Sequence, residues 1–268
     1  MFRFLVSFRY KQQLKTMKYQ PQYSSDSQLT SMREGKRELF LEGHETNFYL
    51  SHDPDYLIQE FKTNGNGNGK RSSKKVSVQA LRGGISCYLF EHIDGFHIPT
   101  HFVKRISDTE MMVRRLDMIP VFVKVYNFSV GTIPERFGIK EGIPLEFPIF
   151  EYYLRGPNQQ FTWVNEHHLY ALGIATPDEA KQINRLASKI NAVLRALCLR
   201  RKLALIEMQL EFGRYKGQVY LGDDLSPRTC RFGDASQEKV VDINKFSPSG
   251  EGTEGIYTEL LDRLSLKI

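Results

Sequence analysis

The chain has 268 residues and a mass of 31.1 kDa; 41% of its residues are hydrophobic and 25% are charged. These ordinary fractions exclude disorder as the dominant state, and the length is sufficient for two modest lobes with a sizeable core. The sequence has no apolar run of about 18 residues, so it predicts no membrane-spanning helix.

The cysteines and histidines show no metal-binding pattern. Cys87, Cys198 and Cys230 are far apart in the chain and lack the spacing of a zinc site. Their odd number and wide separation favour a reducing compartment, and we expect a cytoplasmic protein.

Most of the net charge of +6 lies in the first 31 residues. This segment holds five basic residues and one acid, a net charge of +4, which leaves +2 for the rest of the chain. A nucleic-acid-binding domain should carry its basic excess on the folded part, so we expect no nucleic-acid partner. The segment has weak similarity to a transit peptide. The favoured interpretation is a disordered extension or a start placed too early, with Met17 or Met32 as the true beginning.

The first predicted elements are short strands. Strand-like residues cover 37–41 and 48–61, with interruptions at Gly43 and at the turn-forming residues 53–55. An alternating Asn-Gly run and a basic run over 64–75 then predict an exposed loop, which serves either phosphate contact or simple solvation.

The middle of the chain is predicted as one short helix and one clear strand. Residues 85–93 have the pattern of a short amphipathic helix, and 98–102 resume an extended chain. Residues 121–128 are rich in Val and aromatic residues, which favours a strand. Three prolines over 131–156 predict a loop-dominated region with short elements.

The clearest helix begins at Thr176. Thr176 can cap the helix, Pro177 suits the first helical position, and Glu179 completes a capping box. Apolar residues then recur at helical spacing, which predicts a core-facing stripe: Ile183, Leu186, Ala187, Ile190, Val193, Leu194 and Leu197.

A hairpin follows this helix. Over 206–212, apolar residues alternate strictly with Glu207, Gln209 and Glu211, so one face of the strand is buried and the other is polar. Residues 215–217 turn the chain, and 218–221 return as a second strand that ends in Gly-Asp-Asp.

Acidic residues concentrate at this hairpin. Carboxylates held close together repel, and a cation that neutralises them explains the arrangement most simply. Magnesium bound to nucleotide phosphates needs only one or two protein carboxylates, and the chemistry alone favours Glu211 and Asp223. The alternative for Glu207 and Gln209 is a solvated edge strand.

Two arginines follow the acids. Arg228 and Arg231 suit fork-like recognition of phosphate or carboxylate, although a solvent-exposed salt-bridge network is the alternative. A metal, a nucleotide and an anionic substrate in one site indicate ATP-driven activation of a carboxylate.

The order of several motifs resembles the SAICAR synthetase family (phosphoribosylaminoimidazole-succinocarboxamide synthases) over about residues 33–246. The motifs that carry the resemblance lie at 98–102, 107–110, 116–120, 136–142, 172–177, 210–213 and 221–227.

The resemblance implies an α+β fold of two lobes with a kinase-like ATP-binding N-terminal lobe. We therefore expect a basic extension at 1–31, an ATP-binding lobe at 32–119 and a substrate and metal lobe at 120–268. Family members use ATP and Mg2+ to join L-aspartate to the carboxylate of carboxyaminoimidazole ribotide. The resemblance also implies a homo-oligomer that has no membrane partner.

The resemblance assigns roles to individual residues. Gly35 and Lys36 match residues that contact ATP phosphates, and the backbone from Leu116 to Met118 matches a segment that holds adenine. Glu211 and Asp223 match the magnesium carboxylates, in agreement with the choice made from charge alone, and these two acids with Lys36 are the predicted catalytic residues. Three positions match the substrate-binding region of the family: Thr132, Arg231 and Asn127.

The chain also departs from the family pattern. Glu38 stands where the family has a second lysine, Tyr126 replaces an arginine, and Gln209 replaces a lysine at the catalytic site. Further departures lie at 82–84, 160–163, Arg228 and 247–250.

These departures leave three hypotheses open. The chain is an intact synthetase with altered contacts, a ligase for a different carboxylate, or a non-catalytic nucleotide-binding member. The presence of Glu211 and Asp223 argues against the third, because uniform drift would have removed them with the rest.

Overall fold

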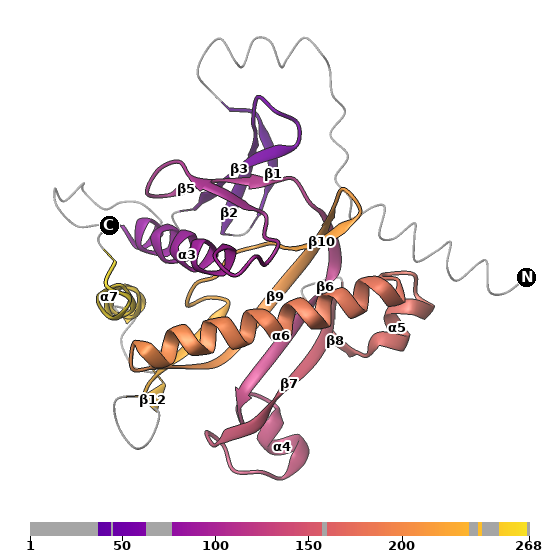
Figure 1. The fold of residues 1–268 in the computed structure, drawn as a ribbon, viewed down its shortest axis with the longest axis vertical. Helices are drawn as coiled ribbons and strands as arrows, with labels where there is room; N and C mark the ends of the chain where they lie inside the picture. Colours follow the sequence, from indigo (N-terminus) through magenta and orange to yellow (C-terminus); the bar gives the residue numbers. More distant parts are fainter. Residues whose placement is uncertain are drawn as a thin grey trace, which may run out of the picture.

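The protein is described here as a computed structural model covering residues 37–43, 45–62, 77–156, 160–235, 241–242 and 252–266. The predictions for the 1–31 extension, Gly35, Lys36 and the 64–75 loop lie outside the described residues. The described chain forms two antiparallel sheets with helices packed on them, and the α+β fold class is confirmed (Figure 1).

The first sheet has five strands in the order β1-β2-β3-β5-β4. The early strand predictions are confirmed, because the chain breaks between β2 and β3 at the expected turn. The strands of this sheet are β1 (Leu39–Glu42), β2 (Thr46–Leu50), β3 (Tyr56–Phe61), β4 (Phe102–Arg105) and β5 (Glu110–Arg114).

Helix α3 (Val78–Asp94) packs against the five-stranded sheet and is longer than the predicted helix at 85–93. The Ser77 side chain accepts a hydrogen bond from the Ala80 N–H and caps the helix, a signal that the sequence prediction missed. The glycines at 83–84 resemble a helix break, but the tight packing of the helix against its neighbours overrides their low helix propensity.

The second sheet has seven strands in the order β12-β11-β9-β6-β7-β8, with β10 paired to β9. The predicted strand at 121–128 and the predicted hairpin are confirmed within β6, β9 and β10. The strands are β6 (Asp117–Phe128), β7 (Pro144–Arg155), β8 (Phe161–Val164), β9 (Leu203–Tyr215), β10 (Gln218–Leu221), β11 (Cys230–Asp234) and β12 (Val241–Asp242).

The prediction of a loop-dominated 131–156 region is wrong. After the short helix α4 (Ile133–Phe137), the chain forms β7, a strand of 12 residues beside β6. Pro144 is the first residue of the strand, and Pro148 lies where the register of β6 and β7 shifts. Proline is tolerated at both kinds of position because neither requires a ladder hydrogen bond from its nitrogen.

Helix α6 (Pro177–Arg200) has the predicted capping box, with both Thr176 and Glu179 bonded as expected. Its apolar stripe is buried against β6 and β9, so α6 covers one face of the seven-stranded sheet (Figure 1). Helix α5 (Glu166–Ala171) precedes it, and α7 (Gly252–Leu264) packs beside α3. In the described part of the chain, no helix has both the length and the apolar character needed to cross a membrane.

The two sheets share one continuous core and meet along the chain. Buried residues of β3, α3 and β9 belong to a single apolar cluster. Thr100 pairs with Leu221, and the N–H of His101 donates to the Leu221 carbonyl at 2.7 Å. The chain changes sheet between Arg114 and Asp117, and the proposed lobe boundary at 119/120 stays a prediction.

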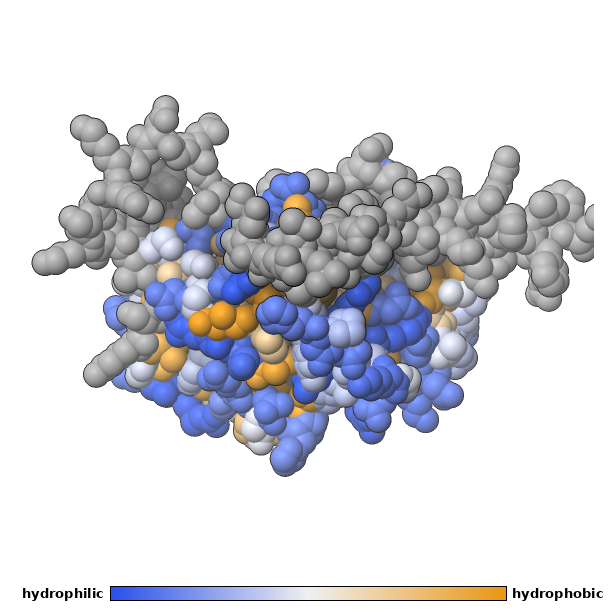
Figure 2. Space-filling model, turned by 90° about the horizontal axis from the view of Figure 1, so that it is seen from above, coloured by the Kyte–Doolittle hydropathy of each residue, from blue (hydrophilic) through white to orange (hydrophobic). Residues whose placement is uncertain are grey.

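The face of the seven-stranded sheet opposite α6 has a polar side-chain row. In β9 the residues Met208, Leu210 and Phe212 are buried, whereas Glu207, Gln209 and Glu211 are partly exposed. This row confirms the predicted alternation. The coloured part of the surface in the view of Figure 2 is mostly hydrophilic, with small hydrophobic areas.

Candidate active site at the junction of the two sheets

Glu211 and Asp223 come together at the open end of the β9–β10 hairpin, away from its turn. The backbone N–H of Gly222 donates to the Glu211 carbonyl at 2.8 Å, which places Asp223 beside this part of β9. The pKa of Asp223 is raised well above its usual value, first by loss of solvent and then by the negative charges of Glu211 and Asp224. The expectation that this hairpin crowds carboxylates is therefore confirmed.

Asp223 has a strained backbone. Its φ of 60° lies in the left-handed region, which non-glycine residues seldom occupy, although Asp tolerates it better than most. Such conformations persist only where the surrounding structure enforces them, and they concentrate at functional sites.

Leu116 and Met118 lie against the same hairpin. A side chain at Gly213 would place its Cβ 2.7 Å from the Leu116 Cβ and 3.0 Å from the Met118 Sδ. At Gly222 a Cβ would lie 3.2 Å from the Met118 Cε. These two glycines therefore let the 116–118 segment approach the acids, and Met118 remains 40% exposed and open to a ligand.

The open face of the seven-stranded sheet extends from this point. Cross-strand register places Phe122 opposite Glu211, Lys124 opposite Gln209, and Tyr126 opposite Glu207. Because side chains alternate along a strand, the members of these pairs lie on one face. On the next strand, Arg231 pairs with Glu207 and extends the row.

The cations of this face are paired with glutamates. The Arg155 Nη2 lies 2.6 Å from the Glu211 Oε1, and the Lys124 Nζ lies 3.1 Å from the Glu207 Oε2. Arg231 approaches the other oxygen of Glu207 at 3.6 Å. An anionic substrate therefore has to displace or share these ion pairs.

A tyrosine–glutamate network continues along β7. Tyr153 donates to Glu151 at 2.6 Å, and Arg136 contacts the other Glu151 oxygen at 2.6 Å. The Tyr126 and Tyr153 hydroxyl oxygens are 3.4 Å apart. Burial is the first cause that raises the pKa of both tyrosines, so both stay neutral hydrogen-bonding groups at neutral pH.

Two predicted substrate residues lie apart from this face. Asn127 is buried toward α6, where its side chain bonds the Asn191 Oδ1 at 2.9 Å and the Leu205 carbonyl at 3.1 Å. Its amide is thus used inside the fold. Thr132 is exposed at the start of α4, at the end of β6 and β7 far from the five-stranded sheet (Figure 1).

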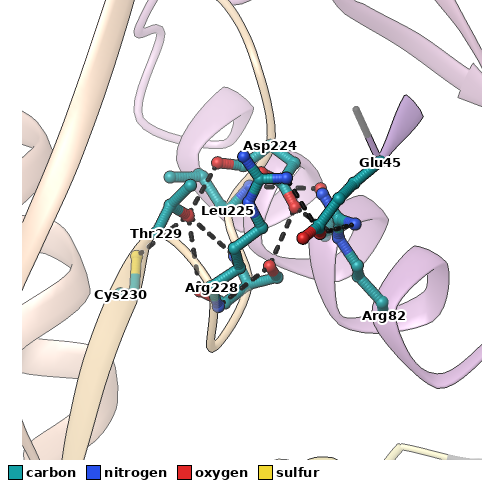
Figure 3. A network of polar contacts seen from close by, with 9 residues as sticks. Glu45, Arg82, Asp224, Leu225, Arg228, Thr229 and Cys230 are labelled. Carbon is teal, nitrogen blue, oxygen red and sulfur yellow. Dashed lines mark hydrogen bonds and ion pairs between the residues drawn. The ribbon is translucent and has the colours of Figure 1, made fainter. Parts of the chain in front are cut away.

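A polar network includes Asp224, which lies in the acidic turn formed by residues 222–224 after β10 (Figure 3). The Arg82 Nε donates to the Asp224 Oδ2 at 2.8 Å, and the Arg82 Nη1 contacts Glu45 at 2.9 Å. Arg228 reaches the same Glu45 oxygen at 2.8 Å. Sequence reasoning placed Arg228 beside the acids but assigned no role to Arg82.

The carboxylates suit a hard cation that brings further ligands with it. Among the residues that the structure describes, no group of three or more His, Cys, Asp or Glu side chains could hold a metal ion. Two carboxylate oxygens with phosphate oxygens and waters are the usual ligand set of such a cation. The fold and the site thus define a two-sheet α+β protein with an acidic turn after β10 and an open, charged sheet face.

Comparison with known proteins identifies the family. The SAICAR synthetase family model matches residues 39–249. The phosphoribosylaminoimidazole-succinocarboxamide synthase of Prosthecochloris aestuarii is 38% identical over 230 residues, which are 85% of this chain and 98% of the relative. The chain belongs to the SAICAR synthetase family, and the predicted resemblance is confirmed.

Solved structures agree with this assignment. The phosphoribosylaminoimidazole-succinocarboxamide synthase of Ehrlichia chaffeensis matches with a TM-score of 0.76 at 27% identity, over 86% of this chain and 100% of that one. A SAICAR synthetase in complex with ADP matches with a TM-score of 0.73 at 31% identity, over 84% of this chain and 97% of that one.

Proposed function

We propose that the chain is an ATP-dependent ligase that joins L-aspartate to the carboxylate of carboxyaminoimidazole ribotide, forming SAICAR in purine biosynthesis. The observation that carries the proposal is the family match, in which the chain spans 98% of a relative named for this product. The junction of the two sheets supplies a matching site, with an acidic turn at one end and paired cations at the other.

ATP is proposed to bind against Leu116 and Met118, with its phosphates toward Glu211 and Asp223. The close approach of the 116–118 segment to Gly213 and Gly222 supports this placement, because it sets an exposed apolar side chain beside the carboxylates. One structural neighbour is a complex with ADP, which is consistent with a nucleotide in this fold. Gly35 and Lys36 stay predictions as phosphate contacts.

Glu211 and Asp223 are proposed to hold Mg2+. Burial and, after it, the negative charges of Glu211 and Asp224 raise the pKa of Asp223 and disfavour a bare carboxylate pair, and oxygen ligands are those that Mg2+ prefers. When bound, the ion neutralises charge on the transferring phosphate. Because Arg155 occupies one oxygen of Glu211 in this structure, Arg155 has to share that carboxylate.

The open sheet face is proposed to hold the ribotide. Glu207 and Glu211 are four residues apart on β9, a distance of about 13 Å along a strand. This distance is suited to a ribotide whose carboxylate lies near the acidic turn and whose phosphate lies near Arg231 and Lys124. Thr132 stays a predicted phosphate contact, and Asn127 is not included because its amide is used internally.

In this reaction the protein acts mainly by positioning its substrates and less by forming covalent bonds with them. An oxygen of the ribotide carboxylate attacks the γ-phosphorus, the bond to ADP breaks, and an acyl phosphate forms. The aspartate amine then attacks the acyl carbon, inorganic phosphate leaves, and the amine loses a proton. The chain's residues orient the three substrates and balance their charge.

A coupled ADP-release assay tests this function. With Mg2+, carboxyaminoimidazole ribotide and L-aspartate, we expect ADP release that requires all three. ADP release with another carboxylic acid in place of the ribotide would instead support a ligase of different specificity, and absence of nucleotide binding in calorimetry would support a non-catalytic member. The homo-oligomeric state and the cytoplasmic location stay predictions.

A further inference from the structure

Arg82 is a buried cation that joins three separate parts of the chain. It projects from α3 and contacts Asp224, in the turn after β10, and Glu45, just before β2. The Arg82 side chain is 6% exposed and that of Asp224 is 0% exposed. Figure 3 shows the guanidinium between the two carboxylates, with Arg228 on the far side of Glu45.

Burial of the ion pair between Arg82 and Asp224 costs free energy. The pair is therefore favourable only when its geometry is well defined. Both charges lose solvation, and removal of either partner leaves an uncompensated charge inside the protein. The Asp224 Oδ2 also accepts a hydrogen bond from the Ser226 hydroxyl at 2.8 Å, whereas the Asp224 Oδ1 is buried without a hydrogen-bond partner. Arg82 and Ser226 together thus fix one oxygen of this carboxylate.

Asp224, whose carboxylate is held in this way, directly follows Asp223, whose backbone is strained. Asp223 holds a left-handed backbone conformation that needs enforcement by its surroundings. The Thr229 hydroxyl donates to the Asp224 backbone carbonyl at 2.9 Å, so both the side chain and the backbone of Asp224 are held. Helix α3 contributes to this enforcement through the ion pair of Arg82 with Asp224 and through the Ser86 hydroxyl, which accepts a hydrogen bond from the Leu225 N–H at 3.2 Å.

We propose that Arg82 is a positioning residue that sets the direction of the Asp223 carboxylate toward the magnesium–nucleotide complex. It acts through Asp224 and touches neither metal nor substrate. The inference rests on the proposed function, because it assigns Asp223 as a metal ligand. The Glu45 contact further implies that one guanidinium sets the β1–β2 connection of the five-stranded sheet and the acidic turn relative to each other.

The test is Mn2+ binding in the presence of ADP, followed by electron paramagnetic resonance of the free ion. Mn2+ takes the same oxygen ligands as Mg2+, and the measurement needs no acceptor substrate. We expect Arg82→Met to weaken Mn2+ binding by about tenfold or more, which is the usual effect of losing a residue that orients a metal ligand. Arg82→Lys keeps the charge but cannot bridge both acids, so it should give a smaller loss.

A matched control distinguishes positioning from stability. Arg263 also bridges two carboxylates, with contacts to Asp234 at 2.9 Å and Glu259 at 2.6 Å. Arg263→Met should lower the melting temperature but leave Mn2+ affinity unchanged. If Arg82→Met does not fold, Arg82→Lys decides by the same criterion.

Wild-type Mn2+ affinity in a folded Arg82 variant would overturn the proposal. Failure of the proposed function has a different signature: the wild-type chain would bind Mn2+ with ADP and still release no ADP from ATP with the ribotide and aspartate. In that case the Mn2+ affinities of the Arg82 variants still test the positioning role.

Discussion

The two ends of the candidate site are built in different ways. At the acidic turn, Gly213 and Gly222 allow close backbone packing, and Asp223 is held in a strained conformation. Along the open sheet face, exposed or partly exposed cations pair with glutamates on other strands of the sheet. The first end tolerates little change in shape, whereas the second consists of ion pairs that substitutions can exchange.

This difference matches some of the chain's departures from its family, whereas the departures at Arg82 and Arg228 lie beside the acidic turn itself. The two predicted magnesium carboxylates and the glycines that pack against Leu116 and Met118 are present. The departures at Tyr126 and Gln209 fall on the open face, where Lys124, Arg155 and Glu207 supply other charges. Gln209 is partly exposed, so a change there alters which polar pairs form, whereas Tyr126 is buried and packs with Val130, Ile133 and Ile206.

The largest expected effect comes from the acidic turn. Glu211→Gln and Asp223→Asn should each reduce kcat by at least about 10²- to 10³-fold, because each removes a charge that holds the cation at the transferring phosphate. Steady-state ADP release measures the loss. The control Glu146→Gln changes a carboxylate on an exposed part of β7 and should leave turnover unaltered. Near-normal turnover in either site variant would contradict the metal assignment.

The next effect tests close packing at the same end. A methyl group at Gly213 would meet the Leu116 Cβ at 2.7 Å, so Gly213→Ala has to move the 116–118 segment. Overpacking of this kind costs about 1–3 kcal/mol, and we expect a rise of about tenfold or more in the KM for ATP. Gly255→Ala, in α7 with no atom within 4 Å of the added Cβ, is the control. An unchanged KM for ATP would exclude the 116–118 segment as the adenine site.

A smaller, substrate-specific effect is expected on the open face. Arg231→Met should raise the KM for the ribotide by about tenfold, the usual result of losing one charge-assisted hydrogen bond, and should leave the KM for ATP unchanged. Equal changes in both KM values would show that the two ends do not act separately. Lys181→Met, on the exposed side of α6, is the control.

The smallest effect concerns acid stability away from the site. The hydrogen bond from Arg214 is the first cause that lowers the pKa of Glu179 in the folded protein. A lowered folded-state pKa contributes stability above the unfolded value of about 4.3, and this stability is lost as the pH falls through the folded value. Glu179→Gln should therefore flatten the dependence of unfolding free energy on pH below about pH 4.3. Denaturant titrations at several pH values measure it, with Asp178→Asn as the control; an unchanged slope would contradict the assignment.

The elements with strong local signals were predictable from the sequence. Helix α6 has a capping box and a regular apolar stripe, and β9 alternates strictly, so local pattern and tertiary burial agree. The proximity of Glu211 and Asp223 also followed from the sequence, because the two strands of a short hairpin bring the residues at its open end close together.

Other features depended on contacts between distant segments. Strand β7 contains two prolines, and only its register with β6 shows why they are tolerated, so Arg155 and Glu151 were missed as residues of the open face. Arg82 and Asp224 are 142 residues apart, and no local pattern connects them. Asn127 is buried in β6, and the sequence alone did not show that its side chain turns toward α6.

The most direct test of the proposed ligase is a single reaction in which ADP and SAICAR are measured together. With wild-type protein, ATP, Mg2+, carboxyaminoimidazole ribotide and L-aspartate, the account predicts that the two products accumulate in equal amounts and that omission of any substrate stops both. ADP that accumulates without SAICAR, or the absence of both products from folded protein, would contradict it.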